Sequence, residues 1–200
     1  MREIGTVRAF ETGNFEVVEN NIIPEKEKMK FIMKLNLYTL LMTVVGIIIV
    51  IVFMPKDFTV NLIELSILLF SFLIYVIVHE LLHGMAFMIW NKTSWNQIKF
   101  GLVLKSGMAY CISKVPVKVN AGRVSLMMPV YIVCIPMLII AFVLKDVALG
   151  IASIMYLSGS TGDFYYMWKL RHTKKDLYMH EEMPTASGYE VGYLLYKKLD

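Results

Sequence analysis

The sequence predicts an all-α polytopic membrane protein with about four transmembrane helices and a short cytoplasmic β-hairpin between helices 2 and 3. The first observation is composition: 57% of the 200 residues are hydrophobic and only 18% are charged. Soluble domains carry about 45–50% apolar and about 25% charged residues. The second is a mean hydropathy of +0.59, and the third is the collection of the apolar residues into long stretches. These features exclude disordered, collagen-like and disulfide-scaffold proteins.

Four apolar stretches are each long enough to cross about 30 Å of hydrocarbon, which takes about 20 helical residues. They cover residues 35–54, 60–90, 124–144 and 147–170. We therefore expect a cytoplasmic N-terminal segment over residues 1–34, a four-helix membrane domain over 35–170, and a cytoplasmic tail over 171–200.

Basic residues alternate between the segments that connect these stretches. Residues 1–34, 91–123 and 169–200 hold six lysines and arginines each, whereas the two short connections hold only Lys56 and Lys145. Because cytoplasmic loops of membrane proteins carry the excess of lysine and arginine, both termini and the middle loop are expected in the cytoplasm of a multi-pass protein of the cell membrane. Orientation and anionic lipid explain the net charge of +4, so nucleic acid is not an expected partner.

The middle loop contains a pattern typical of paired strands. Residues 98–118 alternate roughly between apolar and polar side chains around a turn signal at Lys105-Ser106-Gly107-Met108. We expect a β-hairpin at the cytoplasmic membrane face, with an irregular amphipathic loop as the alternative.

The second stretch contains His79-Glu80-Leu81-Leu82-His83, an HExxH pattern. Residues i and i+4 share one helix face, so both imidazoles can bind one Zn²⁺. Glu80 would lie beside the metal, where it can take a proton from the zinc-bound water and pass it to a leaving amine. Ionisable groups inside an apolar helix are costly unless they are paired or bind metal, which favours a functional site. The alternative is a polar cluster that joins neighbouring helices.

A third ligand is predicted from membrane depth, at about 1.5 Å per helical residue. His79 lies about 28 Å from the outer end of its span, and Asp163 about 24 Å along the descending fourth span. Glu64 is too far from His79 on the same helix, while His172 and His180 fall in the tail. Asp163 follows Ser158-Gly159-Ser160-Thr161-Gly162, whose hydroxyls can bond to freed backbone groups or to ligating side chains. The alternative is a small-residue packing face with a hydrogen-bonded aspartate.

The order of these motifs resembles that of the site-2 protease class of intramembrane metalloproteases. HExxH lies in one membrane helix and is followed by a hairpin, by a proline-containing helix with Pro129 and Pro136, and by Gly162-Asp163 in a later helix. The chain is more similar to a bacterial membrane family of zincin peptidases catalogued as a domain of unknown function. The resemblance implies that His79, His83 and Asp163 are zinc ligands and that Glu80 is catalytic. The order Gly-Asp departs from the Asp-Gly order of the site-2 motif.

We interpret the chain as a zinc-dependent membrane endopeptidase that hydrolyses membrane-tethered peptides or proteins near the cytoplasmic leaflet. The hairpin would offer an edge strand to an extended substrate, because unwound backbone groups in hydrocarbon need partners. The alternative is a non-catalytic membrane protein with a structural or partner-binding metal site, which a fourth protein ligand would favour. A transporter has little support, since no repeat is evident. A divalent metal other than Zn²⁺ also remains open.

The charge pattern generates a topology test. Reporter fusions after Leu170 and near Ser106 should both give a cytoplasmic signal, because both segments are rich in lysine and arginine. An extracytoplasmic signal from either fusion would contradict the predicted orientation and, with it, the depth estimate for Asp163.

Overall fold

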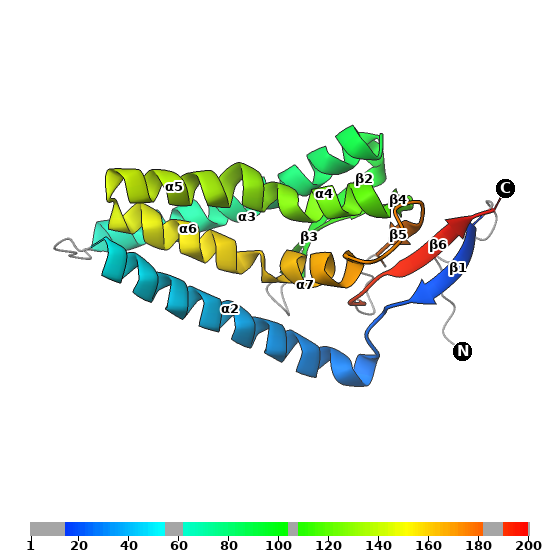
Figure 1. Ribbon diagram of the computed structural model, residues 1–200, viewed down its shortest axis with the longest axis horizontal. Helices are drawn as coiled ribbons and strands as arrows, with labels where there is room; N and C mark the ends of the chain where they lie inside the picture. Colours follow the sequence, from blue (N-terminus) through cyan, green and yellow to red (C-terminus); the bar gives the residue numbers. More distant parts are fainter. Residues whose placement is uncertain (1–14, 55–61, 104–107, 182–189, 200) are drawn as a thin grey trace. The chain divides into compact units, whose positions relative to one another are not determined.

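The computed structural model describes residues 15–54, 62–103, 108–181 and 190–199 (Figure 1). The chain forms two compact units. We call residues 30–83 and 126–168 the helical unit. The described residues of 1–29, 84–125 and 169–200 make up the strand-containing unit.

Six α-helices and one π-helical segment account for most of the described chain. They are α2 (Glu25–Phe53), α3 (Leu62–Trp90), α4 (Val119–Pro129), the π-helical segment η2 (Val130–Cys134), α5 (Ile135–Leu144), α6 (Val147–Gly159) and α7 (Thr161–Leu170). The first helix begins well before residue 35, where the first apolar stretch was expected to start. Glu25 and Glu27 in its first turn favour this beginning, because carboxylates stabilise the positive end of the helix dipole.

The predicted number of four spans is only partly supported. Among the described residues, three helical stretches are long and apolar enough to cross a membrane: Glu25–Phe53, Leu65–Trp90 and Val119–Leu144. The last of these runs through α4, η2 and α5 without a break, and contains both predicted prolines. The expected fourth span is interrupted, since α6 ends at Gly159 and α7 begins at Thr161. A fourth crossing therefore stays a prediction.

The turn between α5 and α6 is defined by two residues. Lys145 adopts a left-handed conformation with φ 54°, and its N–H bonds back to the carbonyls at the end of α5. Asp146 then caps α6, because its carboxylate accepts a hydrogen bond of 3.0 Å from the N–H of Leu149. This tight connection places α5 and α6 side by side (Figure 1).

Two buried clusters hold the helical unit together. One consists of Val50, Met54, Ala141, Val147 and Ile154 from α2, its C-terminal end, α5 and α6. The other joins α3, η2 and α6 through Tyr75, Cys134, Ala152 and Tyr156. The second cluster borders the polar residues described below.

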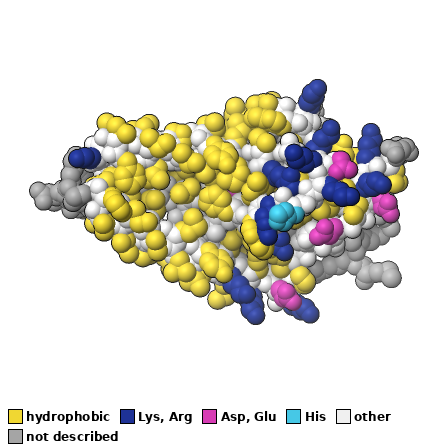
Figure 2. Space-filling model, viewed as in Figure 1, with side chains coloured by type: hydrophobic (Ala, Val, Ile, Leu, Met, Phe, Trp, Pro, Cys, Tyr) yellow, Lys and Arg dark blue, Asp and Glu magenta, His cyan; other side chains and the backbone are white. Residues whose placement is uncertain are grey.

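Much of the apolar surface of these helices faces outward. The hydrophobic side chains of α2 and α3 are largely exposed, as at Leu62, Val52 and Phe70. Figure 2 shows such side chains spread over the visible face of the helices. A soluble monomer rarely exposes so much contiguous apolar surface, so this surface is compatible with a membrane protein.

The strand-containing unit has two separate antiparallel sheets. The first is the hairpin of β2 (Ile98–Val103) and β3 (Met108–Ser113), preceded by the short 3-10 helix η1 (Trp95–Gln97). Its register runs from Ile98 opposite Ser113 to Val103 opposite Met108. The predicted strand pairing is confirmed over these residues. Its position at the cytoplasmic membrane face stays a prediction, and residues 104–107 of the predicted turn lie outside the described residues.

The second sheet corrects the all-α prediction. Its strand order is β1-β6-β5-β4, formed by β1 (Phe15–Asn20), β6 (Leu194–Lys198), β5 (Tyr178–His180) and β4 (Val117–Lys118). The end of the predicted hairpin thus pairs with the chain's tail rather than with β2. The segments near both termini, expected as cytoplasmic appendages, pair with each other. Partners so distant in the sequence leave no local pattern by which to predict them.

The backbone hydrogen bonding between β1 and β6 continues beyond the two strands, on either side of Gly192. The N–H of Asn21 bonds to the carbonyl of Tyr193 at 3.0 Å, and that of Ile23 to the carbonyl of Val191 at 2.8 Å. Between these bonds, Gly192 has φ +132°, and a Cβ there would lie 2.4 Å from the carbonyl oxygen of Asn21. Both the conformation and the close approach require glycine.

We expect Gly192→Ala to lower the free energy of unfolding by about 1–3 kcal/mol, because a β-carbon strains this backbone conformation and meets rigid backbone atoms. Thermal unfolding in detergent would measure the loss. Gly159→Ala is the matched control. Apart from its chain neighbours and the backbone of its own helix, no atom lies within 4 Å of the added carbon. Equal midpoints for the two variants would contradict this role of Gly192.

Candidate metal centre

His79 and His83 lie one turn apart on α3, so both side chains leave the same face of the helix. Both are buried, with 9% and 8% of their surface exposed. Their Nε2 atoms approach to 3.0 Å, and their rings are nearly perpendicular, with centroids 4.6 Å apart. The HExxH spacing therefore brings two imidazole nitrogens to one point.

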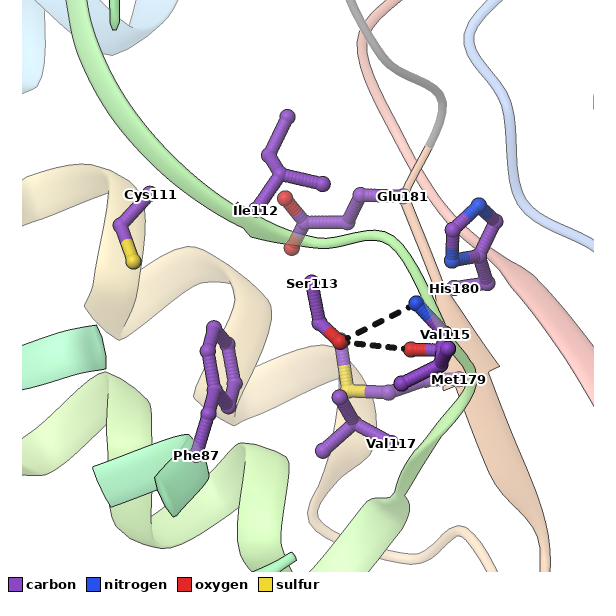
Figure 3. Close-up of a pocket in the computed structure, with 9 residues that line it drawn as sticks. All are labelled: Phe87, Cys111, Ile112, Ser113, Val115, Val117, Met179, His180 and Glu181. Carbon is purple, nitrogen blue, oxygen red and sulfur yellow. Dashed lines mark hydrogen bonds between the residues drawn. The ribbon is translucent and has the colours of Figure 1, made fainter. Parts of the chain in front are cut away.

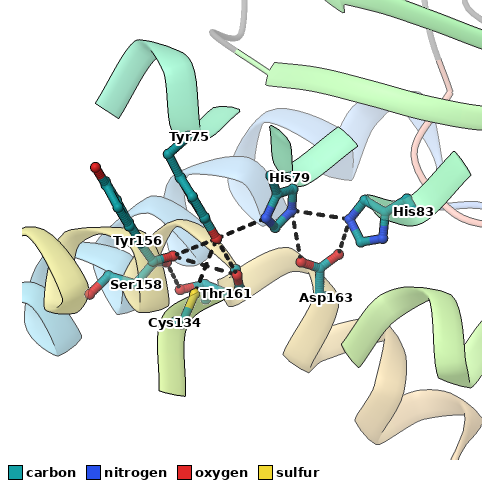
Figure 4. Close-up of polar contacts among 9 residues, drawn as sticks. Tyr75, His79, His83, Cys134, Tyr156, Ser158, Thr161 and Asp163 are labelled. Carbon is teal, nitrogen blue, oxygen red and sulfur yellow. Dashed lines mark hydrogen bonds and ion pairs between the residues drawn. The ribbon is translucent and has the colours of Figure 1, made fainter. Parts of the chain in front are cut away.

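Asp163 reaches this point from the first turn of α7 (Figure 4). Its Oδ2 lies 3.1 Å from Nε2 of His79, and its Oδ1 lies 3.4 Å from Nε2 of His83. Only 13% of its side chain is exposed. All three residues predicted as metal ligands belong to the helical unit, and the structure brings them together.

The break before α7 decides where Asp163 sits. Ser160 leaves the helical conformation with φ −81° and ψ 13°, and its N–H bonds to the carbonyl of Leu157 at 3.2 Å. The N–H of Phe164 then bonds to the carbonyl of Ser160, which restarts the helix. Hydroxyl groups bond to carbonyls around this break, as the sequence predicted: Ser158 to Ile154, and Thr161 to Ser158.

The spacing of the three groups fits a zinc ion. Nitrogen and oxygen ligands lie about 2.0–2.2 Å from Zn²⁺, so neighbouring corners of a tetrahedron are about 3.3–3.6 Å apart. The observed separations of 3.0, 3.1 and 3.4 Å lie within this range or up to about 0.3 Å below it, so a small outward shift of the side chains would make room for the ion. Two imidazoles and one carboxylate are also a donor set that catalytic zinc sites use. The residues present therefore fit the ion that the sequence implies.

The group consists of three side chains that could bind a metal ion. Within the described residues, no other histidine, cysteine, aspartate or glutamate side chain joins His79, His83 and Asp163. Structural zinc sites are usually closed by four protein ligands, whereas catalytic sites keep one position for water or substrate. The number of candidate ligands is the number that protein side chains supply in catalytic zinc sites.

Glu80 is not a member of this group, although it directly follows His79 on α3. Its side chain is partly buried, and it interacts electrostatically with His79 and Asp163. Glu80 is thus a carboxylate next to the candidate metal-binding group in the sequence but outside it.

Tyr75 is a site residue that the sequence analysis missed. It lies one turn before His79 on α3, with 5% of its surface exposed. Its hydroxyl is 2.9 Å from Nδ1 of His79 and 3.2 Å from Sγ of Cys134 (Figure 4). It also donates toward the carbonyl of Tyr156 at 3.2 Å and lies 3.3 Å from Oγ of Ser160. The i−4 spacing from His79 was the signal available in the sequence.

The two other histidines do not join the cluster. His172 and His180 belong to the strand-containing unit, where His180 is buried in β5. Burial lowers the pKa of His180 to about 4, so it is neutral at physiological pH. The sequence analysis excluded Glu64 as a ligand because it is too far from His79 along the helix, and its side chain lies outside the described part of the structure.

A small hollow in the strand-containing unit is the other concave feature of note (Figure 3). It is lined by Phe87, Cys111, Ile112, Ser113, Val115, Val117, Met179, His180 and Glu181. Within it, Oγ of Ser113 donates to the carbonyl of Val115 at 2.7 Å. Among the described residues, its cysteine, histidine and glutamate do not converge as a metal-binding group.

Comparison with known proteins supports the interpretation of the site. A family model described as "Putative zincin peptidase" matches residues 72–178, more than half of the chain. The match includes His79, Glu80, His83 and Asp163. No curated protein and no solved structure matches the chain, so the likeness to site-2 proteases stays a resemblance. On the extent of the family match, the chain belongs to the zincin peptidase family so described.

Proposed function

We propose that the protein is a zinc-dependent endopeptidase of the cell membrane that hydrolyses peptide bonds of membrane-associated substrates near the cytoplasmic leaflet. The observation that carries this proposal is the convergence of His79, His83 and Asp163, with ligand atoms 3.0–3.4 Å apart and with three candidate protein ligands rather than four. Membership of the zincin peptidase family supports the same chemistry.

In this proposal His79, His83 and Asp163 hold the ion. When bound, zinc supplies Lewis-acid polarisation of the scissile carbonyl and of the attacking water. Glu80 accepts the proton that this water loses and delivers it to the nitrogen of the leaving amine. The C–N bond then breaks, the amine leaves with this proton on its nitrogen, and Glu80 returns to its carboxylate form. No residue forms a covalent bond to the substrate.

The proposed substrates are membrane-tethered peptides or proteins. Three long apolar helices with exposed outer faces support a location in the membrane, and the lysine and arginine pattern supports cytoplasmic termini. The HELLH segment lies in the half of α3 nearer the basic middle loop, which favours cleavage near the cytoplasmic leaflet. An extended substrate strand paired with the 98–118 hairpin stays a prediction.

Metal content provides the first test. Purified wild-type protein should contain about one zinc ion per chain, and His79→Ala, His83→Ala and Asp163→Ala should each lose most of it. Each change removes a ligand from a set of three. Elemental analysis of protein purified in detergent without added chelator measures the ratio.

His172→Ala is the matched control, because His172 is a histidine outside the described metal-binding group. It should keep the wild-type zinc content. Full zinc content in Asp163→Ala would contradict Asp163 as a ligand, and zinc loss in the control would point to unspecific binding.

Glu80→Gln separates metal binding from turnover. The amide keeps the shape of the carboxylate but is a poor base, so we expect unchanged zinc content and a turnover about 10²–10⁴-fold lower. Cleavage of a library of membrane-anchored peptides in vesicles, followed by mass spectrometry, would measure turnover.

Two results would contradict this assignment. If Glu80→Gln lost zinc as fully as the histidine variants, Glu80 would be a ligand. If the zinc-loaded wild-type protein cleaved no member of the library, a non-catalytic metal site would be favoured over a peptidase.

A further inference from the structure

The hydroxyl of Tyr75 contacts a metal-site histidine on the side that faces away from the metal ligands. Nε2 of His79 is directed at His83 and Asp163, at 3.0 and 3.1 Å. Its other ring nitrogen, Nδ1, lies 2.9 Å from the oxygen of Tyr75. The imidazole is therefore held between the ligand cluster and one buried hydroxyl.

The protons on this imidazole follow from its two contacts. A neutral imidazole carries a single N–H, and a nitrogen that binds metal must offer a lone pair. If Nε2 of His79 binds the ion, the hydrogen is on Nδ1, and Nδ1–H donates to the oxygen of Tyr75. The tyrosine must then direct its own O–H elsewhere.

The helix break provides the acceptor for that O–H. In a continuous helix the N–H of Ser160 would bond to the carbonyl of Tyr156, but here it bonds to Leu157 instead. The carbonyl of Tyr156 accepts from Tyr75 at 3.2 Å, and more weakly from Oγ of Ser160 at 3.5 Å. The break before Asp163 thus also frees a carbonyl that accepts the O–H of Tyr75.

Ring packing holds Tyr75 in this position. Its ring stacks on that of Tyr156, with centroids 4.1 Å apart and planes 3° apart. It meets the imidazole of His79 edge-on, at 5.4 Å and 65°. Both tyrosines are nearly fully buried, so the hydroxyl has little freedom to turn away.

We propose that Tyr75 is a positioning residue of the metal centre. It accepts the hydrogen bond from Nδ1–H of His79, donates its own O–H to the carbonyl of Tyr156, and so orients the lone pair of Nε2 toward the ion. This inference rests on the proposed zinc centre and adds to it a residue outside the ligand set. Hydrogen bonds of this kind typically strengthen metal binding about 10–100-fold.

Tyr75→Phe removes the hydroxyl while keeping the stacked ring. We expect the zinc dissociation constant to rise about 10–100-fold, measured by competition with a chromophoric chelator in detergent. Tyr156→Phe is the matched control, because it makes the same change on the stacked partner, whose hydroxyl points away from His79 (Figure 4). Its dissociation constant should stay within about twofold of the wild-type value, since it removes no bond to a metal-site histidine.

A spectroscopic readout separates positioning from general packing. The chain has only four histidines, so ¹⁵N-histidine labelling of the zinc-loaded protein gives a spectrum simple enough to assign. In the wild type and Tyr156→Phe, His79 should bind through Nε2 and show a hydrogen-bonded Nδ1–H far downfield. In Tyr75→Phe this resonance should move upfield and exchange faster with water.

The outcomes distinguish the two proposals. Zinc bound to Nδ1 of His79 in the wild type, or equal zinc affinity in wild type and Tyr75→Phe, would overturn the role of Tyr75 and leave the zinc centre standing. Equal weakening by both tyrosine substitutions would assign the effect to packing and also overturn it. A wild-type protein that binds no zinc would overturn the centre and this inference together.

Discussion

The interruption of the helical chain at Ser160 is the constraint on which the site depends. Backbone groups inside apolar surroundings must find partners within the protein, because each unsatisfied group costs several kcal/mol. The break frees carbonyls at the end of α6, and nearby hydroxyls of Ser158, Ser160 and Thr161 bond to carbonyls in this region. The cluster of small polar residues in the fourth apolar stretch thus surrounds the break, and Asp163 lies in the first turn of the helix that follows it, within 3.1 and 3.4 Å of the two histidines.

The long helix α3 supplies the rigid half of the site. Tyr75, His79 and His83 follow one another at intervals of four residues, so they form a single stripe on its surface. The stripe faces η2 and α6 through Tyr75 and its neighbours Cys134 and Tyr156. Placing metal ligands on a regular helix fixes their geometry better than a loop would, and the stacked tyrosines limit the movement of the first histidine. Asp163 is the ligand that depends on a distant part of the chain.

Much of the site could be predicted from the sequence because several of its residues are separated by short, regular intervals along one helix. The four-residue spacing of His79 and His83 is a property of any α-helix, and the depth of Asp163 follows from counting residues along two spans. Tyr75 has the same spacing from His79 but was missed, because a tyrosine in an apolar helix is common and its partners are far away. The carbonyl of Tyr156 and Oγ of Ser160 are 81 and 85 residues further along the chain.

The sequence by itself predicted a membrane protein, the HExxH pair with its glutamate, and the β2–β3 hairpin, because each depends on composition or on contacts between residues close in the chain. Only the tertiary structure decided that the fourth apolar stretch divides into α6 and α7, and that β1 pairs with β6. It also decided that the hydroxyl of Tyr75 meets Nδ1 of His79 while bonding to a carbonyl of α6. These features depend on which distant segments meet. The helix and strand propensities of a segment do not predict such pairings. A helix break or an edge strand is stabilised by partners that the local sequence does not contain.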